Sequence, residues 1–179
     1  MTPRSTSERL VATALGLVGG RPAVVADVGT GSGALALAIA RAAPQARVWA
    51  TDTNPAALTL ARENVLRQGL GERVTVHEGD LLEPVPGWVD LVVANLPYLP
   101  ARERGLHADL AGEPEEALFA ARDGLGPYRR LLGACKTRLT PGGALVVQFR
   151  RRVYAARRDE LEALRDRLED EATLALEAA

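Results

Sequence analysis

The sequence has few of the residues that form disulfides or bind metals. It contains one cysteine, Cys135, and two histidines, which excludes an internal disulfide and leaves no cysteine-histidine pattern for zinc. The net charge of -1 gives no general attraction to nucleic acid or membranes. No apolar run approaches the roughly 20 residues that span a bilayer. Residues Leu10–Val18 have the spacing of an amphipathic helix rather than an export signal, so a cytoplasmic protein is expected.

The 179 residues, of which 47% are hydrophobic, fit a single domain with one conventional core. Ser5 and Glu8 have capping-box spacing, and Gly19-Gly20 would end the helix that they begin. The expected organisation is a leading helix in residues 1–20, a core in residues 24–149, and a C-terminal helix and tail in residues 150–179.

Short apolar runs predict strands, and longer runs with helical spacing separate them. The expected strands are Val24–Val28, Arg47–Asp52, Arg73–His77, Val89–Ala94 and Ala144–Phe149. This alternation predicts an α/β fold with a mostly parallel sheet and helices on both faces. Helices are expected over Ala34–Ala43, Asn54–Gln68, Tyr128–Leu139 and Tyr154–Leu168. The segment Ala172–Glu177 fits either a sixth strand or more helix, and the polar loop over residues 99–126 is interpreted as a lid or substrate loop.

A glycine turn and several polar residues follow the predicted strands. The turn is Gly29-Thr30-Gly31-Ser32-Gly33, and the polar residues are Asp27, Asp52, Asp80 and Asn95. In an open α/β sheet the carboxyl ends of the strands line the ligand crevice, so these residues are expected to converge. The structural alternatives are a plain turn for the glycines, and caps of neighbouring turns or helices for Asp52 and Asp80.

The turn resembles a dinucleotide fingerprint, but its third glycine comes one position early and Asp27 would repel a pyrophosphate. S-adenosyl-L-methionine fits better. Its carboxylate suits the amides of the glycine turn and its ammonium suits Asp27. Its ribose suits Asp52, and its adenine amine suits Asp80, with Leu81 beside it. If the turn bound a dinucleotide instead, calorimetry would detect NAD and not S-adenosylmethionine.

The segment Asn95-Leu96-Pro97-Tyr98 is the candidate reaction centre. Pro97 restricts Leu96 to an extended conformation and so directs the Leu96 carbonyl, beside which the Asn95 side-chain oxygen is a second acceptor. Two such acceptors can receive both hydrogens of a planar NH2 group while Tyr98 stacks on it. An amide or an adenine amine meets this description, because the lone pair of each is delocalised and needs alignment and electrostatic help rather than a dedicated base.

Several motifs together resemble the class I methyltransferases that modify amide or base nitrogens, namely Val24–Ala40, Asp52, Gly79-Asp80 and Asp90–Tyr98. Further motifs resemble the release-factor glutamine methyltransferase family, often called HemK or PrmC. These are Pro3-Arg4 with Glu8, Glu113-Pro114 with Ala117-Leu118, Asp123-Gly124-Leu125, Tyr128-Arg129 and Pro141-Gly142-Gly143. The resemblance implies a Rossmann-like fold, S-adenosylmethionine as cofactor, and methyl transfer to a glutamine side-chain amide of a peptide chain release factor.

The chain departs from the family at three places, and each leaves an alternative open. Leu96 stands where the family usually has proline and is more like the ribosomal RNA adenine dimethyltransferases, so adenine methylation of RNA or DNA is the second hypothesis. The 179 residues contain no counterpart of the family's N-terminal helical domain, so a small activator protein or a non-catalytic cofactor-binding role is also considered. Gln148-Phe149-Arg150 replaces a Glu-hydrophobic-Gly motif, which predicts a sheet truncated at its C-terminal strand pair.

An arginine cluster over residues 150–158 follows the last predicted strand of the core. A solvated helix face is the favoured interpretation, and an RNA contact is the alternative. Cys135, His77 and His107 are interpreted as structural or solvated residues.

Overall fold

The computed structural model describes residues 5–97, 99–100, 119–120, 124–149, 158–159, 162–163 and 173–178. A parallel six-stranded sheet forms the centre, with the order β3-β2-β1-β4-β7-β8. Its strands are β1 (Ala23–Val28), β2 (Ala46–Asp52), β3 (Val74–Glu78), β4 (Val89–Ala94), β7 (Leu139–Phe149) and β8 (Thr173–Ala178). The order reverses direction at β1, so the crevice expected for a ligand lies outside the carboxyl ends of β1 and β4.

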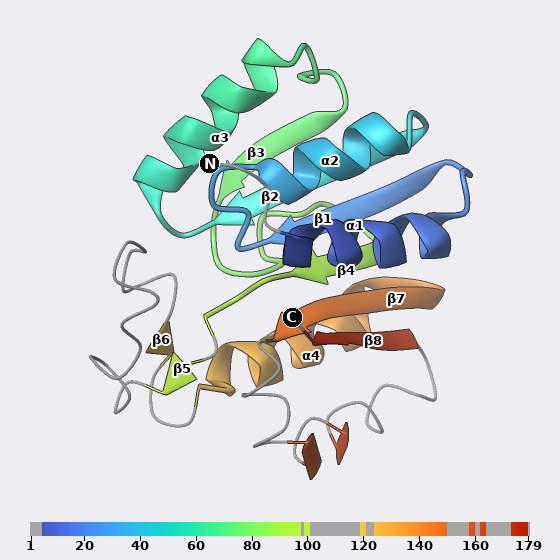
Figure 1. Cartoon of the computed structure of the whole chain (residues 1–179), viewed down its shortest axis with the longest axis vertical. Helices are drawn as coiled ribbons and strands as arrows, with labels where there is room; N and C mark the ends of the chain where they lie inside the picture. Colours follow the sequence, from blue (N-terminus) through green and yellow to red (C-terminus); the bar gives the residue numbers. More distant parts are fainter. Residues whose placement is uncertain are drawn as a thin grey trace.

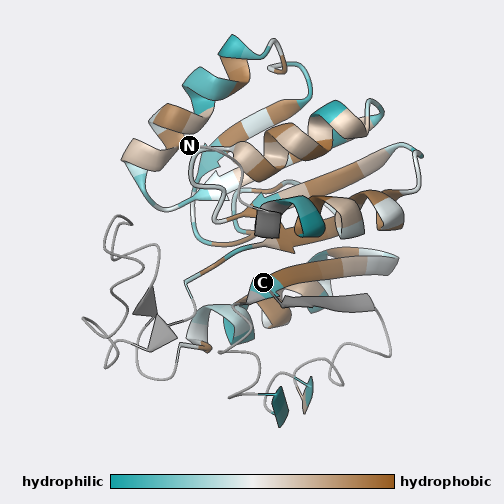
Figure 2. Cartoon of the chain, in the orientation of Figure 1, coloured by the Kyte–Doolittle hydropathy of each residue, from teal (hydrophilic) through white to brown (hydrophobic). Residues whose placement is uncertain are grey.

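Four helices cover the two faces of this sheet (Figure 1). Three pack on one face: α1 (Ser5–Val18), α2 (Ala34–Ala42) and α3 (Pro55–Arg67). The fourth, α4 (Gly126–Arg138), covers the other face through Leu131, Leu132 and Cys135. Figure 2 shows the consequence of this layering, because the strands are hydrophobic while much of the outer surface of the helices is hydrophilic. The expected α/β architecture is confirmed.

The boundaries of most elements differ from the predicted ones by only one or two residues, but the C-terminal part of the sheet differs more. The segment Ala172–Glu177, for which the sequence fits either strand or helix, almost coincides with strand β8 (Thr173–Ala178). This strand runs parallel to the last six residues of β7, so the sheet carries a parallel strand at the end where truncation of the C-terminal strand pair is predicted. Of the predicted helix Tyr154–Leu168, residues 158–159 and 162–163 are helical and the remainder lies outside the described residues.

The segment Thr140-Pro141-Gly142-Gly143, which contains one of the motifs of the family resemblance, lies inside β7, where the pairing with β4 is irregular. Val89 pairs with Leu139, and Leu91 already pairs with Ala144. Asp90 lies between these two pairs, where its Oδ1 accepts from Thr140 Oγ1 at 3.1 Å and its Oδ2 accepts from the Val24 amide at 2.8 Å. Asp90 belongs to one of the motifs that resemble the methyltransferases. In the structure it joins the amino-terminal ends of β1, β4 and β7, at the opposite end of the strands from the candidate site.

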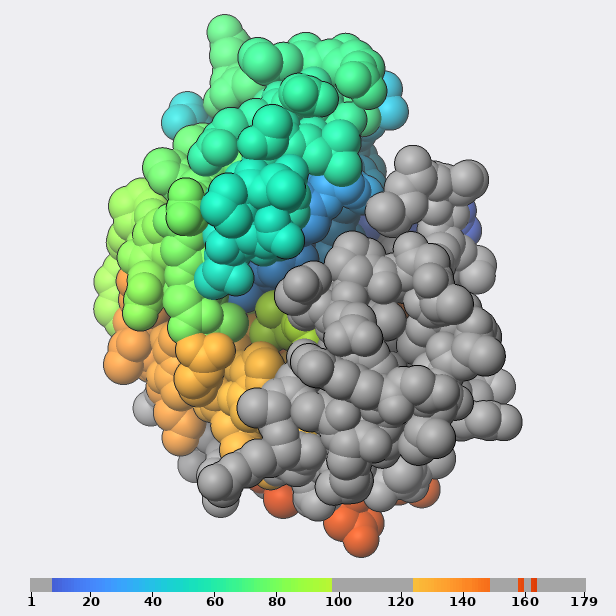
Figure 3. Space-filling view, turned by 90° about the vertical axis from the view of Figure 1, so that its left-hand side faces the viewer, coloured from blue at the N-terminus to red at the C-terminus, as the bar shows by residue number. Residues whose placement is uncertain are grey.

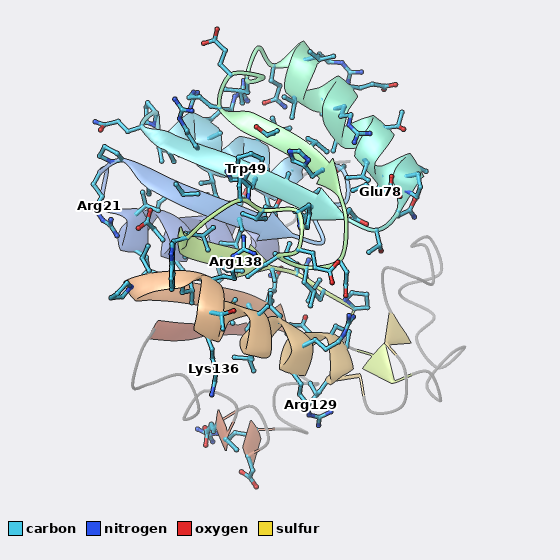
Figure 4. All side chains as sticks on the ribbon, turned by 180° about the vertical axis from the view of Figure 1, so that it is seen from behind. Arg21, Trp49, Glu78, Arg129, Lys136 and Arg138 are labelled. Atoms are coloured by element: carbon cyan, nitrogen blue, oxygen red, sulfur yellow. The ribbon has the colours of Figure 1, made fainter. Side chains whose placement is uncertain are left out.

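The polar loop predicted over residues 99–126 contains a short parallel pair, β5 (Leu99–Pro100) with β6 (Phe119–Ala120). The prediction that this loop is a lid falls mostly on residues outside the described ranges. His107 and Tyr98 also lie outside them. Cys135 is completely buried, and burial raises the pKa of its thiol to about 12. The thiol therefore stays protonated and packs as a small hydrophobic side chain in the core. His77 stacks on Trp49, labelled in Figure 4, with 5.1 Å between the ring centroids.

The described residues contain neither a membrane-spanning helix nor a metal-binding cluster. No helix among them is long and apolar enough to cross a membrane. Within the same ranges, no group of three or more histidine, cysteine, aspartate or glutamate side chains is arranged to hold a metal ion.

Candidate functional site

The carboxyl ends of four adjacent strands, β3, β2, β1 and β4, lie along one side of the sheet and bring the predicted site segments together. The Gly29 and Thr30 amides both donate to the Thr51 carbonyl at 2.9 Å, which joins the glycine turn to the end of β2. The Gly79 amide donates to the Asp52 carbonyl at 3.0 Å and joins the segment after β3 to the same edge. In Figure 3, which faces this edge, the colours of the segments after β1, β2, β3 and β4 lie next to one another.

Gly29 adopts a left-handed conformation with φ of 71° and lies against the candidate reaction centre. A Cβ atom added to it would approach Leu96 Cδ2 to 2.7 Å, which is closer than packed carbon atoms allow. The backbone conformation favours glycine here, and any larger residue would also have to displace the buried side chain of Leu96. Leu96 is only 6% exposed, so its side chain fills the space between the turn and the core rather than facing solvent.

Asp27, expected to bind the ammonium of a cofactor, is buried beneath the turn. Its Oδ2 accepts from Thr30 Oγ1 at 2.6 Å and from the Ala36 amide at 3.0 Å. Among the described residues no hydrogen bond reaches its Oδ1, so one oxygen is left for another donor. Burial raises the pKa of Asp27 to about 6, although the hydrogen bonds from Thr30 and Ala36 oppose that rise. The carboxyl can therefore change its charge close to neutral pH.

Asp52, expected to bind ribose hydroxyls, also holds the turn in place. Its Oδ2 accepts from the Gly31 amide at 2.8 Å, and its Oδ1 accepts from the Asn54 amide at 2.9 Å. Each carboxylate oxygen can accept more than one hydrogen bond, so these contacts leave capacity for further donors. The glycine-turn amides were predicted to bind the cofactor carboxylate, but the amides of Gly29, Thr30, Gly31 and Gly33 all donate hydrogen bonds within the fold. Ser32 is fixed through its carbonyl, which accepts from Asn64 Nδ2 at 2.9 Å.

Asp80, expected to bind an adenine amine, forms an ion pair with Arg130 of α4. The two side chains are 36% and 59% exposed, so water screens the pair and its contribution to stability is small. They line a depression of about 320 Å³ together with Leu81 and residues of α4. Leu81 has a φ of 52°, and its carbonyl accepts from Thr51 Oγ1 at 2.8 Å. No sequence pattern points to Arg130, which lies 50 residues away from its partner.

The segment after β4 places its residues in different environments. Asn95 is exposed, Leu96 is buried and Pro97 is half-buried. The Leu96 carbonyl, proposed above as an acceptor for a substrate, accepts a hydrogen bond from the Tyr128 hydroxyl at 2.7 Å. Tyr128 is 2% exposed. The sequence motif Tyr128-Arg129 supports the family resemblance but does not predict this contact. No local pattern connects Tyr128 to a residue 32 positions earlier.

Comparison with known proteins now identifies the family. A model of the methyltransferase small domain family matches residues 8–112. The chain belongs to this family. The match includes the glycine turn, Asp52, Asp80 and the segment Asn95–Tyr98.

Several similar proteins share the name release factor glutamine methyltransferase. A release factor glutamine methyltransferase of Moorella thermoacetica is 50% identical over 127 residues, which are 70% of this chain and 45% of the relative. The protein of the same name from Bordetella pertussis is 44% identical over 149 residues, which are 81% of this chain and 54% of the relative. The chain thus spans about half the length of the curated relatives that it matches.

Solved structures place the fold among methyltransferases as well. A ribosomal protein L11 methylase from Lactobacillus delbrueckii subsp. bulgaricus has a TM-score of 0.53 and 26% identity, with 76% of this chain and 56% of that chain covered. A protein titled precorrin 8w decarboxylase, from Methanobacterium thermoautotrophicum, has a TM-score of 0.59 and 24% identity over 95% of this chain and 73% of its own. The second likeness concerns the fold alone.

Proposed function

We propose that the chain transfers a methyl group from S-adenosylmethionine to a planar NH2 nitrogen, and that the acceptor is a glutamine side-chain amide of a peptide chain release factor. One observation carries the proposal: at the end of β4 the exposed Asn95 is followed by Leu96, whose carbonyl is held by Tyr128 and whose side chain lies against the glycine turn. Family membership and the names of the relatives support the reaction type and the substrate.

The residues after β1, β2 and β3 fit the proposed cofactor. The free oxygen of Asp27 suits an ammonium group, because the other oxygen already accepts two hydrogen bonds within the fold. Asp52 and Asp80 are partly exposed carboxylates that suit the hydroxyls and the amine of an adenosine. When bound, S-adenosylmethionine supplies an electrophilic methyl group on a positively charged sulfur.

The chain's own contribution is to orient the acceptor nitrogen. Asn95 Oδ1 and the Leu96 carbonyl would accept the two N–H groups and so direct the nitrogen lone pair out of the amide plane. As positive charge develops on that nitrogen, its N–H groups become stronger donors, and both hydrogen bonds strengthen in the transition state. Proline at position 97 limits the backbone freedom of Leu96 and keeps this acceptor in place.

The hypothesis of adenine methylation depends on the leucine at position 96. The structure places the Leu96 side chain in the core, against Gly29. The residue type at this position therefore affects packing and backbone shape, and only the carbonyl is directed at the proposed acceptor. This weakens the argument for adenine. Of the arginine cluster proposed for RNA, the described Arg158 pairs with Glu162 at 2.9 Å, and the positions 150–157 lie outside the described residues. A small activator protein stays a prediction.

The function is tested with methyl-labelled S-adenosylmethionine, the purified chain, and three separate acceptors: a purified release factor, total RNA, and duplex DNA. We expect label only on the release factor, with mass spectrometry locating it on a glutamine side chain. Label on RNA or DNA would support the adenine hypothesis instead. If calorimetry detects the cofactor but no acceptor is labelled, the chain is a cofactor-binding protein, and the proposed function is wrong.

Cofactor affinity should depend on pH through Asp27. Because the pKa of this buried carboxyl is about 6 and an ammonium prefers the ionised form, the affinity should be highest between that pH and the pH at which the ammonium of the cofactor loses its own proton. It should weaken as the pH falls through 6, by up to about tenfold for each further pH unit. Calorimetric titrations of S-adenosylmethionine over this range measure the effect. In Asp27→Asn the affinity should be lower and nearly independent of pH; an equal slope in both proteins would contradict the role.

A further inference from the structure

The hydroxyl of Tyr128 lies between two backbone carbonyls at the carboxyl edge of the sheet. It is 2.7 Å from the Leu96 oxygen and 3.3 Å from the Gln148 oxygen. A phenol has a single proton, so the shorter contact to Leu96 receives it. Leu96 follows β4 and Gln148 lies in β7, so one side chain joins the reaction centre to the neighbouring strand.

The support beneath this hydroxyl is rigid. Tyr128 lies in the first turn of α4, and Leu131, Leu132 and Cys135 bury the same face of that helix. At the other end of α4, Arg138 donates from Nε to the Gly87 carbonyl at 2.9 Å and also bonds the Val85 carbonyl. Figure 4 shows the molecule from behind and labels Arg138; in this view α4 lies on the side of the sheet that faces the reader. A helix held at both ends keeps the phenol oxygen at a fixed place relative to β4.

We infer that Tyr128 is a positioning residue for methyl transfer, which holds the Leu96 carbonyl in the orientation that receives one N–H of the acceptor. This inference rests on the proposed function and names a residue that acts through another. A carbonyl oxygen has two lone pairs. Tyr128 occupies one from the buried side, which fixes the plane of the Leu96-Pro97 peptide and leaves the second lone pair for the acceptor.

Replacing Tyr128 by phenylalanine removes the hydroxyl and preserves the ring that fills the core. We expect kcat for the release factor to fall roughly tenfold, the usual effect of one lost hydrogen bond. The Kd of S-adenosylmethionine, measured by calorimetry, should stay within about twofold, because the hydroxyl that is removed lies against the carbonyls of Leu96 and Gln148, neither of which is assigned to the cofactor. If the hydroxyl instead competed with the acceptor for the carbonyl, Tyr128→Phe would raise kcat or lower KM, and the inference would be overturned.

Cys135→Ala is the matched control. Cys135 lies two turns further along the same buried face of α4 and is equally inaccessible, so its truncation tests a small loss of packing without changing the Leu96 contact. We expect its kcat to remain close to that of the unmodified chain. An equal fall in both variants would show that general loosening of α4 is responsible.

A spectroscopic measurement separates this inference from the proposed function. In uniformly ¹³C,¹⁵N-labelled protein, the carbonyl ¹³C resonance of Leu96 should move upfield in Tyr128→Phe, because a hydrogen bond to the oxygen deshields that carbon. It should not move in Cys135→Ala. An unchanged resonance in Tyr128→Phe would overturn the contact whatever the activity. A shifted resonance in a protein that methylates no acceptor would support the contact but contradict both its catalytic purpose and the proposed function.

Discussion

Replacing Asn95 by alanine should lower the turnover of methyl transfer by about 100-fold or more, the usual loss when one preorganised polar group is removed from a transition state. That factor corresponds to about 2.7 kcal/mol of activation free energy. The cost should fall on turnover rather than on cofactor affinity, because the acceptor strengthens its bond to Asn95 only as charge develops on the nitrogen. Asn95 is exposed, so the free energy of unfolding should change by no more than about 0.5 kcal/mol.

Single-turnover rates at saturating cofactor and release factor measure this effect directly. Asn95→Asp retains an acceptor oxygen at the same place and should keep more activity than Asn95→Ala. Gln45→Ala is the control, because Gln45 is an exposed amide between α2 and β2, at the opposite edge of the sheet. Turnover by Asn95→Ala equal to that of the control would show that Asn95 does not orient the acceptor.

Much of the sheet and of the site edge could be predicted because the signals are local. Short buried runs such as Val24–Val28 and Val89–Ala94 predict strands, and the strands of a parallel sheet end at one edge. Residues that follow those strands must therefore be neighbours, even though Asp27 and Asn95 are far apart in the chain. The glycine turn was equally easy to predict from the sequence, since a strand, small residues and a helix follow each other without interruption.

The contacts that hold the site together could not be predicted in the same way. Tyr128 meets Leu96, and Arg130 meets Asp80, only because α4 packs across the rear face of the sheet. The position of that helix depends on tertiary packing. The segment Thr173–Ala178 shows the same limit, because its alanines, leucines and glutamate suit a helix as well as a strand. Pairing with β7 decides in favour of the strand.

Gly29→Ala should be the most damaging substitution in the turn. An alanine with a φ of 71° costs about 1–2 kcal/mol, and its Cβ would approach Leu96 Cδ2 to 2.7 Å, which adds an overpacking cost of about 1–3 kcal/mol. We expect the free energy of unfolding to fall by about 2–5 kcal/mol in urea titrations followed by circular dichroism. Turnover should fall as well, because a displaced Leu96 carries its carbonyl with it.

Gly142→Ala separates the two causes, because Gly142 has a similar φ of 76° with open space where a Cβ would lie. It should lose only the backbone contribution of about 1–2 kcal/mol. The double variant Gly29→Ala/Leu96→Ala should then be less destabilised than the sum of its single variants, since truncating Leu96 removes the atom that the new Cβ would meet. Additive losses would mean that the turn and the reaction centre are independent. A favourable coupling would mean that the leucine at position 96 and the first glycine of the turn are constrained together, so that the cofactor turn and the acceptor segment form one packed unit.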